Sequence, residues 1–217
     1  MIALSLSGAR SGALRILCLG CHSDDVEIGC GGTILRLAEE RPDCVFHWVV
    51  FSAIGVRAAE AQQAVAQFVD PSRLAGLMLK TFPDGFMPFA GADVKAAFEE
   101  LKQSVSPDLI FTHSRKDAHQ DHRLIAELTW NTFRDHLILE YEIPKYDGDM
   151  GQPNVFVPLP TAICERKVDL IMKTFQSQCG KQWFQRETFL SLVRLRGMEC
   201  NAPGGYAEAF FGRKLVL

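Results

Sequence analysis

Short, almost wholly apolar runs alternate with helical patterns along the first two thirds of the chain, and this alternation limits the fold more than any other feature. The apolar runs cover residues 14–21, 45–51, 74–79 and 108–112. Helical patterns follow them from residue 33 onward and over residues 57–68, 94–105 and 124–133. Strands that are apolar along their whole length are typical of a parallel sheet covered on both faces. The pattern therefore predicts an α/β, Rossmann-like fold, with a mainly parallel sheet flanked by helices on both faces.

The order of elements becomes looser in the last third of the chain. We expect a strand over residues 138–143, a loop with a short extended piece over 144–160, helices over 162–175 and 183–195, and an edge strand over 210–217. No internal repeat and no linker rich in Pro, Gly or Ser divides the sequence. A chain of 217 residues has the size of one domain, so we expect a single domain over residues 1–217.

Composition and charge exclude several classes of protein. The chain is 47% apolar and 23% charged, as in an average globular protein, and its net charge of −3 offers no general attraction for nucleic acid or an anionic membrane. No apolar run approaches the ~20 residues that cross a bilayer, and the basic-then-apolar order of a signal peptide is missing. We therefore expect a cytoplasmic protein that acts on a small molecule, and we leave its oligomeric state open.

Seven cysteines are scattered along the chain. An odd, dispersed set favours reduced thiols over a disulfide framework. Cys18 and Cys21 form a C-x-x-C pair, but residues three apart on a strand point to opposite faces of the sheet. We interpret them as buried small side chains and not as a redox or metal pair.

Polar clusters follow two of the expected strands. Residues 22–25 (HSDD) follow the first strand and residues 113–122 (HSRKDAHQDH) follow the fourth, and together they contain four of the six histidines. Ligands bind beyond the carboxyl ends of the strands in open parallel sheets, so the two clusters are expected to converge. Imidazoles and carboxylates without cysteine are the ligands of a catalytic zinc or iron site that keeps one position open for water.

The adjacent acids Asp24 and Asp25 suggest a division of roles. One carboxylate can bind the metal while the other faces the substrate. Metal coordination lowers the pKa of water toward ~7, and a neighbouring carboxylate can complete its deprotonation during attack on a carbonyl. This chemistry suits amide hydrolysis.

A glycine-rich segment after the first cluster offers a different interpretation. Residues 29–33 (GCGGT) lead into a helical pattern whose N-terminal NH groups could hold a phosphate. The G-x-G-x-x-G spacing of a dinucleotide site is missing, however, and the two carboxylates before it would repel a pyrophosphate. Paired glycines also allow close packing of a helix on a strand, which is the interpretation we prefer.

The clusters and their surroundings resemble the LmbE-like de-N-acetylases, the family of N-acetylglucosaminyl-phosphatidylinositol de-N-acetylase (PIG-L). Residues 22–33 (HSDDVEIGCGGT) are similar to the family's H-P-D-D motif with its trailing glycines, and residues 117–122 (DAHQDH) to its H-x-D-H motif. The resemblance covers residues 14–135 and extends more faintly to residues 206–210. It departs at Ser23, where the common proline and its fixed φ are lost.

The resemblance implies a metal-dependent amide hydrolase that carries Zn²⁺, with Fe²⁺ as an alternative. It implies that the metal ligands are His22, Asp25 and His122. Asp24 is implied to be the general base for the metal-bound water, and His119, if protonated, is implied to stabilise the oxyanion.

Four further residues are expected to have roles other than metal binding and proton transfer. Arg57 and Asp84 resemble positions where the family contacts its sugar, although an ion pair from Arg57 to Glu60 and an ordinary turn at Asp84 are the alternatives. Asp121 is expected to orient His122 or His119 from behind. Asp117 is expected to be a loop or helix-capping residue.

The implied reaction is hydrolysis of the acetamide of an N-acetylated amino sugar, in a glycoside or a sugar nucleotide, to a free amine and acetate. This reaction belongs to carbohydrate metabolism. The last third of the chain adds charged and aromatic residues that suit a sugar or its aglycone, among them Glu142, Lys145 and Arg196. Two alternatives remain: a zinc amidase acting on a thiol conjugate or another non-sugar amide, and a non-hydrolytic sugar-binding homologue.

Overall fold

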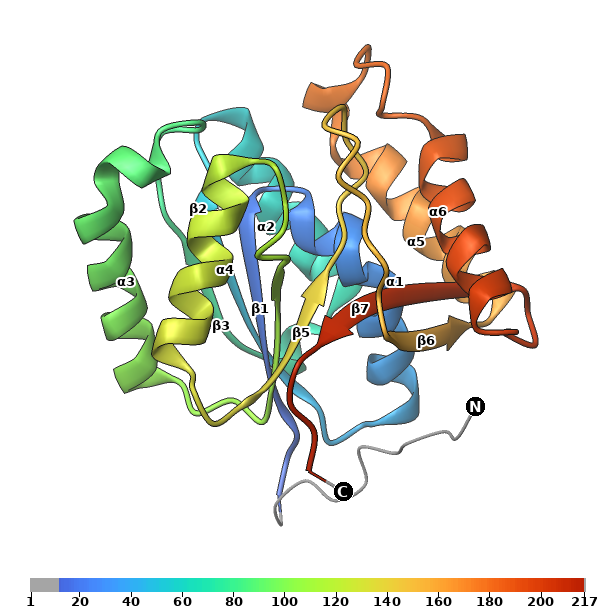
Figure 1. Ribbon diagram of the computed structural model, residues 1–217, viewed down its shortest axis with the longest axis horizontal. Helices are drawn as coiled ribbons and strands as arrows, with labels where there is room; N and C mark the ends of the chain where they lie inside the picture. Colours follow the sequence, from blue (N-terminus) through green and yellow to red (C-terminus); the bar gives the residue numbers. More distant parts are fainter. Residues whose placement is uncertain (1–11, 217) are drawn as a thin grey trace.

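The computed structural model describes residues 12–216 and contains a seven-stranded sheet with helices on both faces (Figure 1). The strands are β1 (Arg15–His22), β2 (Val45–Ser52), β3 (Leu74–Leu79), β4 (Leu109–His113), β5 (Leu137–Tyr141), β6 (Val155–Leu159) and β7 (Tyr206–Gly212). Their order across the sheet is β3-β2-β1-β4-β5-β7-β6, and β1 to β5 are parallel. The predicted α/β class with a mainly parallel sheet is confirmed.

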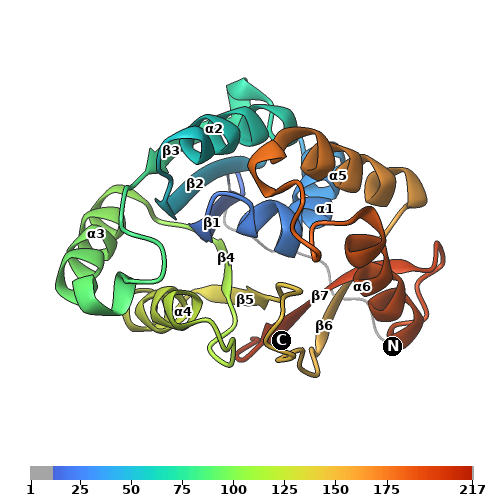
Figure 2. The same cartoon turned by 90° about the horizontal axis from the view of Figure 1, so that it is seen from above.

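Two groups of helices cover the sheet (Figure 2). The helices are α1 (Asp25–Glu40), α2 (Val56–Phe68), α3 (Gly91–Ser104), α4 (Gln120–Thr132), α5 (Thr161–Thr174) and α6 (Arg186–Glu199), with short 3₁₀ turns at Pro71–Arg73, Met87–Ala90 and Gln176–Gln178. α3 and α4 pack on one face, and α1, α2 and α5 pack on the other. Cys18 belongs to one core and Cys21 to the other, as the alternation of side chains along a strand requires.

The C-terminal strand was expected at the edge of the sheet, and this expectation is wrong. β7 pairs antiparallel with both β5 and β6, so that β6 forms the edge. Hydropathy along one strand shows that the strand is buried but does not show which strands flank it, because pairing is decided by contacts between distant segments.

Helix α1 begins at Asp25, eight residues before the helical pattern that is visible in the sequence. Gly29, Gly31 and Gly32 lie inside it and hide the apolar periodicity. A Cβ atom at Gly29 would lie 2.2 Å from Tyr141 Cδ2, and one at Gly32 would lie 2.5 Å from Leu159 Cδ1. These glycines therefore permit close helix packing, and they do not form a phosphate-binding loop.

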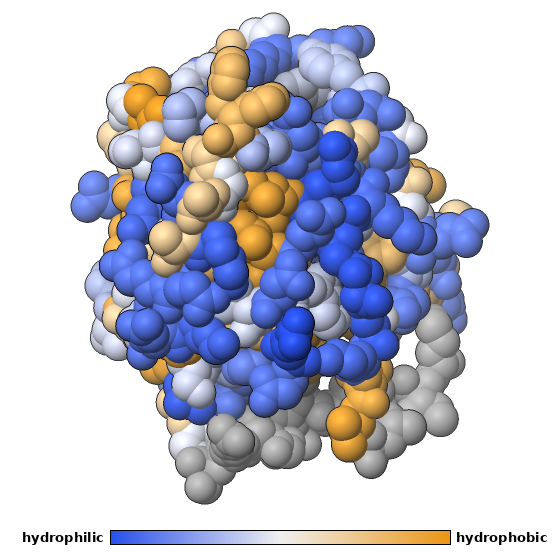
Figure 3. Space-filling model, turned by 60° about the vertical axis from the view of Figure 1, so that its left-hand side comes forward, coloured by the Kyte–Doolittle hydropathy of each residue, from blue (hydrophilic) through white to orange (hydrophobic). Residues whose placement is uncertain are grey.

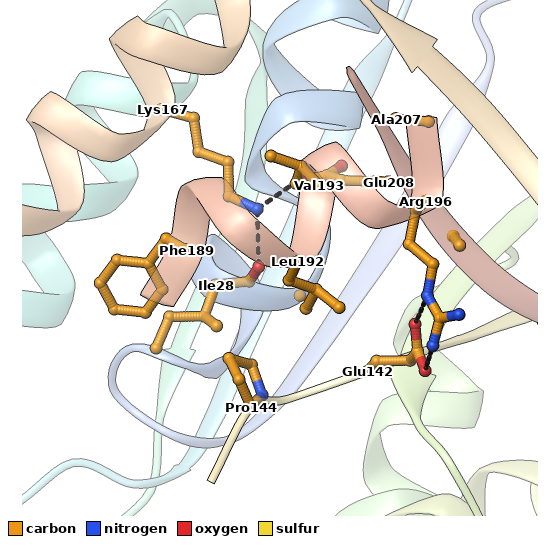
Figure 4. A pocket seen from close by; sticks show the side chains of 12 residues that line it. Ile28, Glu142, Pro144, Lys167, Phe189, Leu192, Val193, Arg196, Ala207 and Glu208 are labelled. Carbon is orange, nitrogen blue, oxygen red and sulfur yellow. Dashed lines mark hydrogen bonds and ion pairs between the residues drawn. The ribbon is translucent and has the colours of Figure 1, made fainter. Parts of the chain in front are cut away.

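A buried ion pair joins the C-terminal elements to α1 (Figure 4). Lys167 Nζ of α5 donates to Glu208 Oε1 of β7 at 2.6 Å and to the Ile28 carbonyl at 2.7 Å. The Glu208 carboxylate also accepts the backbone N–H groups of Gly32 and Thr33, at 2.8 and 2.6 Å. The pair thus holds α1, α5 and β7 together from within the core.

Hydropathy at the surface and along the helices bears on whether the chain could span a membrane. The face shown in Figure 3 is mostly hydrophilic, with small groups of apolar side chains between polar ones. Within residues 12–216, no helix has the length and apolar content needed to span a bilayer.

Candidate active site and metal centre

The two polar clusters converge at the carboxyl ends of β1 and β4, which are parallel neighbours in the middle of the sheet. His22 ends β1 and Asp25 begins α1, while His113 ends β4 and His122 lies in the first turn of α4. The expected meeting of the clusters at one place in the sheet is therefore found.

Three side-chain atoms form a nearly equilateral triangle in this position. His22 Nδ1 lies 3.1 Å from His122 Nε2 and 3.3 Å from Asp25 Oδ2, and the third side, from His122 Nε2 to Asp25 Oδ2, is 3.6 Å. Ligand atoms ~2.0–2.1 Å from a tetrahedral zinc ion are about 3.3 Å from one another. The three residues are 9%, 3% and 3% exposed, in the order His22, Asp25, His122. The triangle therefore fits a buried metal ion held by two nitrogens and one oxygen.

Cys21 lies beside this triangle but differs from it chemically. Its Sγ atom is 3.8 Å from His22 Nε2 and 3.5 Å from Met87 Sδ. Burial raises the pKa of the Cys21 thiol to about 12. Since the thiolate is the form that binds metals, Cys21 is a poor ligand next to two imidazoles and a carboxylate.

A carboxylate faces the outer nitrogen of each imidazole. His122 Nδ1 lies 3.0 Å from Asp117 Oδ2, and His22 Nε2 lies 2.9 Å from Asp84 Oδ1. Carboxylates in such positions fix the ring orientation and tautomer of metal-binding histidines. The hydrogen bond to His22 is the main cause that lowers the pKa of Asp84 to about 2. The Asp84 side chain is still 65% exposed, so it is also open to a ligand.

Asp117 has a larger role in the geometry than the sequence suggested. Its Oδ1 atom accepts the backbone N–H of His119 at 2.8 Å, which is the expected loop contact. Its Oδ2 atom faces His122. Burial would raise the pKa of Asp117, but the hydrogen bond from His122 and nearby positive charge, including that of Lys145, lower it. The sequence signal for this contact was only an acid five positions before His122.

The Asp121 carboxylate holds the turn that carries Asp84. It accepts the backbone N–H groups of Gly85 at 2.6 Å and Met87 at 3.3 Å, and its Oδ2 atom is 3.8 Å from His22 Nε2. Its backbone N–H donates to His119 Nδ1 at 3.3 Å. The carboxylate therefore lies nearer to His22 than was expected of a residue that orients His119 or His122.

Arg57 is directed toward Asp24. Arg57 Nη2 lies 2.5 Å from Asp24 Oδ1, whereas the Glu60 carboxylate accepts from the backbone N–H and hydroxyl of Ser177. The alternative pairing of Arg57 with Glu60 is therefore not formed. Burial raises the pKa of Asp24, although the positive charge of Arg57 opposes this shift. A buried carboxylate of raised pKa is suited to accepting a proton.

His119 is arranged as a neutral hydrogen-bond donor. Burial, together with the positive charge of His122 and His22, lowers its pKa. Its Nδ1 atom accepts the backbone N–H of Asp121, so the neutral ring carries its proton on Nε2. The ring can therefore donate to a substrate oxygen in its neutral form, whereas the sequence-based expectation was a protonated ring.

Two further buried residues, His113 and Glu27, have no role predicted from the sequence. The His113 ring stacks on that of His122 with centroids 3.9 Å apart, and its Nε2 atom accepts the Cys21 backbone N–H at 3.0 Å. Glu27 is 1% exposed, and neither of its carboxyl oxygens has a hydrogen-bond partner among the described residues. Burial and the charges of Asp24 and Asp25 raise the pKa of Glu27. The sequence does not single out either residue, because what distinguishes them is their burial in the folded chain.

The chain is similar to several known proteins. A family model described as GlcNAc-PI de-N-acetylase (PIG-L) matches residues 17–133. N,N′-diacetylchitobiose deacetylase from Pyrococcus horikoshii has a similar structure, with a TM-score of 0.71 and 19% identity over 93% of this chain and 84% of the other. The 4-carboxy-2-hydroxymuconate hydratase of Pseudomonas putida KT2440 has a TM-score of 0.72 and 19% identity over 94% of this chain and 98% of the other. A teicoplanin deacetylase in its zinc-inhibited form has a TM-score of 0.70 and 13% identity over 91% of this chain and 97% of the other. At these identities the likeness establishes a shared fold, and that fold is used by enzymes with different reactions.

Proposed function

Since the chain belongs to the GlcNAc-PI de-N-acetylase (PIG-L) family, we propose that it is a zinc-dependent de-N-acetylase. The proposed reaction hydrolyses the acetamide of an N-acetylated amino sugar, in a glycoside or a sugar nucleotide, to a free amine and acetate. Two of the proteins that share its fold are deacetylases, of diacetylchitobiose and of teicoplanin. The hydratase with the same fold makes a direct assay of the reaction necessary.

The observation that carries the proposal is the triangle of His22 Nδ1, Asp25 Oδ2 and His122 Nε2. Two neutral imidazoles and one carboxylate suit Zn²⁺, and Fe²⁺ accepts the same ligand types. When bound, zinc supplies Lewis acidity and lowers the pKa of water to about 7. The three residues are proposed as its protein ligands.

The other side chains of the site supply proton transfer and orientation. Asp24, held by Arg57 at 2.5 Å, is proposed to take a proton from the attacking water. His119 Nε2–H is proposed to donate to the amide oxygen as negative charge develops on it. When the C–N bond breaks, protonated Asp24 returns its proton to the leaving nitrogen, so that the amine leaves neutral and the carboxylate is restored.

The substrate is proposed to meet the chain at Arg57 and Asp84. Both side chains are partly exposed, 23% and 65%, and each touches a residue of the site, Asp24 and His22 respectively. A charged pair of this kind suits the hydroxyl groups of a sugar.

We also propose that residues 1–217 form one domain in the cytoplasm. β5, β6 and β7 continue the sheet that begins within the matched region, which supports one domain. The seven cysteines are free, and free thiols fit a reducing compartment.

The proposal is tested by metal content and acetate release together. Purified protein, reconstituted with Zn²⁺ or anaerobically with Fe²⁺, is compared with His122→Ala and Asp24→Asn on a panel of N-acetylated sugars, sugar nucleotides and thiol conjugates. We expect about one equivalent of metal in the wild type, loss of metal and activity in His122→Ala, and retained metal in Asp24→Asn with activity ~10²–10⁴-fold lower. Asp70→Asn, which removes an exposed acid whose carboxylate accepts from the backbone N–H and hydroxyl of Ser72, is the control.

Four outcomes would redirect the proposal. A folded wild type that binds no metal after reconstitution contradicts it. Unchanged acetate release by Asp24→Asn contradicts the role of that carboxylate. Amine release from thiol conjugates without acetate release from any sugar would favour the zinc amidase instead, and metal binding with no hydrolysis would favour a sugar-binding homologue.

A further inference from the structure

Lys145 lies outside the matched family region, in the segment between β5 and β6, yet its ammonium group reaches the surroundings of the candidate metal ligands. Lys145 Nζ is 3.1 Å from Asp117 Oδ2, the atom that faces His122 Nδ1 at 3.0 Å. It is also 2.6 Å from Asp149 Oδ2. The Lys145 side chain is 13% exposed and that of Asp117 is 3% exposed, so solvent screens this contact weakly.

The segment that carries Lys145 is itself fixed to the loop before α4. Asp149 Oδ2 accepts the backbone N–H of Ala118 at 2.6 Å, next to Asp117 in the chain. The ammonium group therefore lies between two carboxylates that belong to different segments. Without it, two like charges would face each other in a largely buried space and would separate.

We propose that Lys145 is a positioning residue for the metal ligand His122, and that it acts through Asp117. Its charge holds the Asp117 carboxylate in place, and that carboxylate keeps the His122 ring turned with Nε2 toward Asp25 and His22. The inference rests on the metal site of the proposed function. It adds a residue of the last third of the chain to the machinery that prepares this site.

The cavity beside Lys145 supplies a matched control. It has a volume of about 380 Å³, and its lining includes Lys145, Asp117, Asp149 and Lys116. Lys116 is exposed, and no ion pair of its side chain is found within residues 12–216. Lys116→Gln thus removes the same charge from the same cavity without removing a contact to Asp117.

The test measures zinc affinity of the metal-free full chain by competition with a chromophoric chelator, so that it does not depend on substrate. Partners behind a metal-binding histidine typically contribute ~10–100-fold to metal affinity. We expect Lys145→Gln to weaken zinc binding about tenfold or more, Lys145→Arg to restore most of the loss, and Lys116→Gln to change the affinity less than about twofold. Circular dichroism and thermal unfolding establish that each variant is folded.

A double-mutant cycle separates action through Asp117 from general destabilisation. If Lys145 acts through Asp117, then Lys145→Gln adds little to the loss caused by Asp117→Asn, because the carboxylate it holds is already gone. Additive losses, or a folded Lys145→Gln protein with wild-type zinc affinity, overturn the proposal. If Lys145→Gln does not fold, Asp149→Asn replaces it, since it removes the second anchor of the ammonium, and unchanged zinc affinity there also overturns the proposal.

The same measurements separate failure of the proposed function from failure of the role of Lys145. A wild type that binds no zinc refutes the proposed function. A wild type that binds zinc as tightly as a folded Lys145→Gln variant leaves the proposed function standing and refutes only the role of Lys145.

Discussion

Replacing Lys167 by methionine would test whether the buried ion pair behind α1 stabilises the protein. The side chains of Lys167 and Glu208 are 3% and 2% exposed. Removing the ammonium leaves a buried carboxylate with two backbone N–H groups and no counter-charge. Breaking a buried pair in this way typically costs ~3–5 kcal/mol.

The neighbouring residue provides a closely matched control. Arg166, on the same helix, pairs with Glu39 at 3.1 Å, but the two side chains are 50% and 55% exposed. Exposed pairs contribute ~0–1 kcal/mol. Arg166→Met also replaces a long cationic side chain by methionine, one position before Lys167. It should nevertheless change the unfolding free energy by less than ~1 kcal/mol.

Urea unfolding, followed by tryptophan fluorescence and by circular dichroism, gives both free energies. In thermal unfolding, ~3–5 kcal/mol corresponds to a fall in Tm of about 6–20 °C for a chain of this length. If Lys167→Met loses no more stability than Arg166→Met, the ion pair does not hold α1 against α5 and β7. Burial of the pair would then not make it stabilising.

Three other perturbations follow from the structure. Because the pKa of Glu27 is raised, the folded state retains a proton that the unfolded state releases above about pH 4.3. The unfolding free energy of the metal-free protein should therefore fall as the pH rises from there. The fall is up to ~1.4 kcal/mol per pH unit until the folded-state pKa is reached. Glu27→Gln should lack this slope in urea unfolding at pH 5 and pH 8, and parallel pH profiles of the two proteins would contradict the assignment. Gly29→Ala, whose Cβ would lie 2.2 Å from Tyr141, should lower the unfolding free energy by ~1–3 kcal/mol or more. Gly91→Ala, with open space around its Cβ, should not lower it. Equal losses of unfolding free energy would show that α1 does not pack against Tyr141 as closely as described. Zinc at 100 times its Kd should raise the unfolding free energy by ~2.7 kcal/mol, and an equal gain measured by calorimetry in His122→Ala would place the ion elsewhere.

Much of the architecture could be predicted because the relevant signals are local. The strands at residues 45–51 and 74–79 are visible as apolar runs, and the structure has them within one residue. The start of α1 could not be predicted from periodicity, since its first turns contain three glycines and buried acids. The position of β7 within the sheet could not be predicted either, because it depends on pairing with strands more than 45 residues earlier in the chain.

In the candidate site, the metal ligands could be predicted from the sequence, but the residues that contact them could not. That His22, Asp25 and His122 come together follows from two neighbouring parallel strands, each ending in a polar cluster. The partners behind them do not follow from the sequence. Asp84 reaches His22 from the segment after β3, and Lys145 reaches Asp117 from the segment after β5.

The sequence by itself determined the alternation of strands and helices, the types of the candidate metal ligands and their place at the ends of two strands. Each of these is a property of a short segment, in which hydropathy period and residue type are sufficient. Only the tertiary structure decided that Arg57 faces Asp24 and that the neutral His119 ring carries its proton on Nε2. It also decided that Glu27 is buried with neither carboxyl oxygen hydrogen-bonded within residues 12–216. Those features depend on distances between segments and on the exclusion of water, which exist only once the chain has folded.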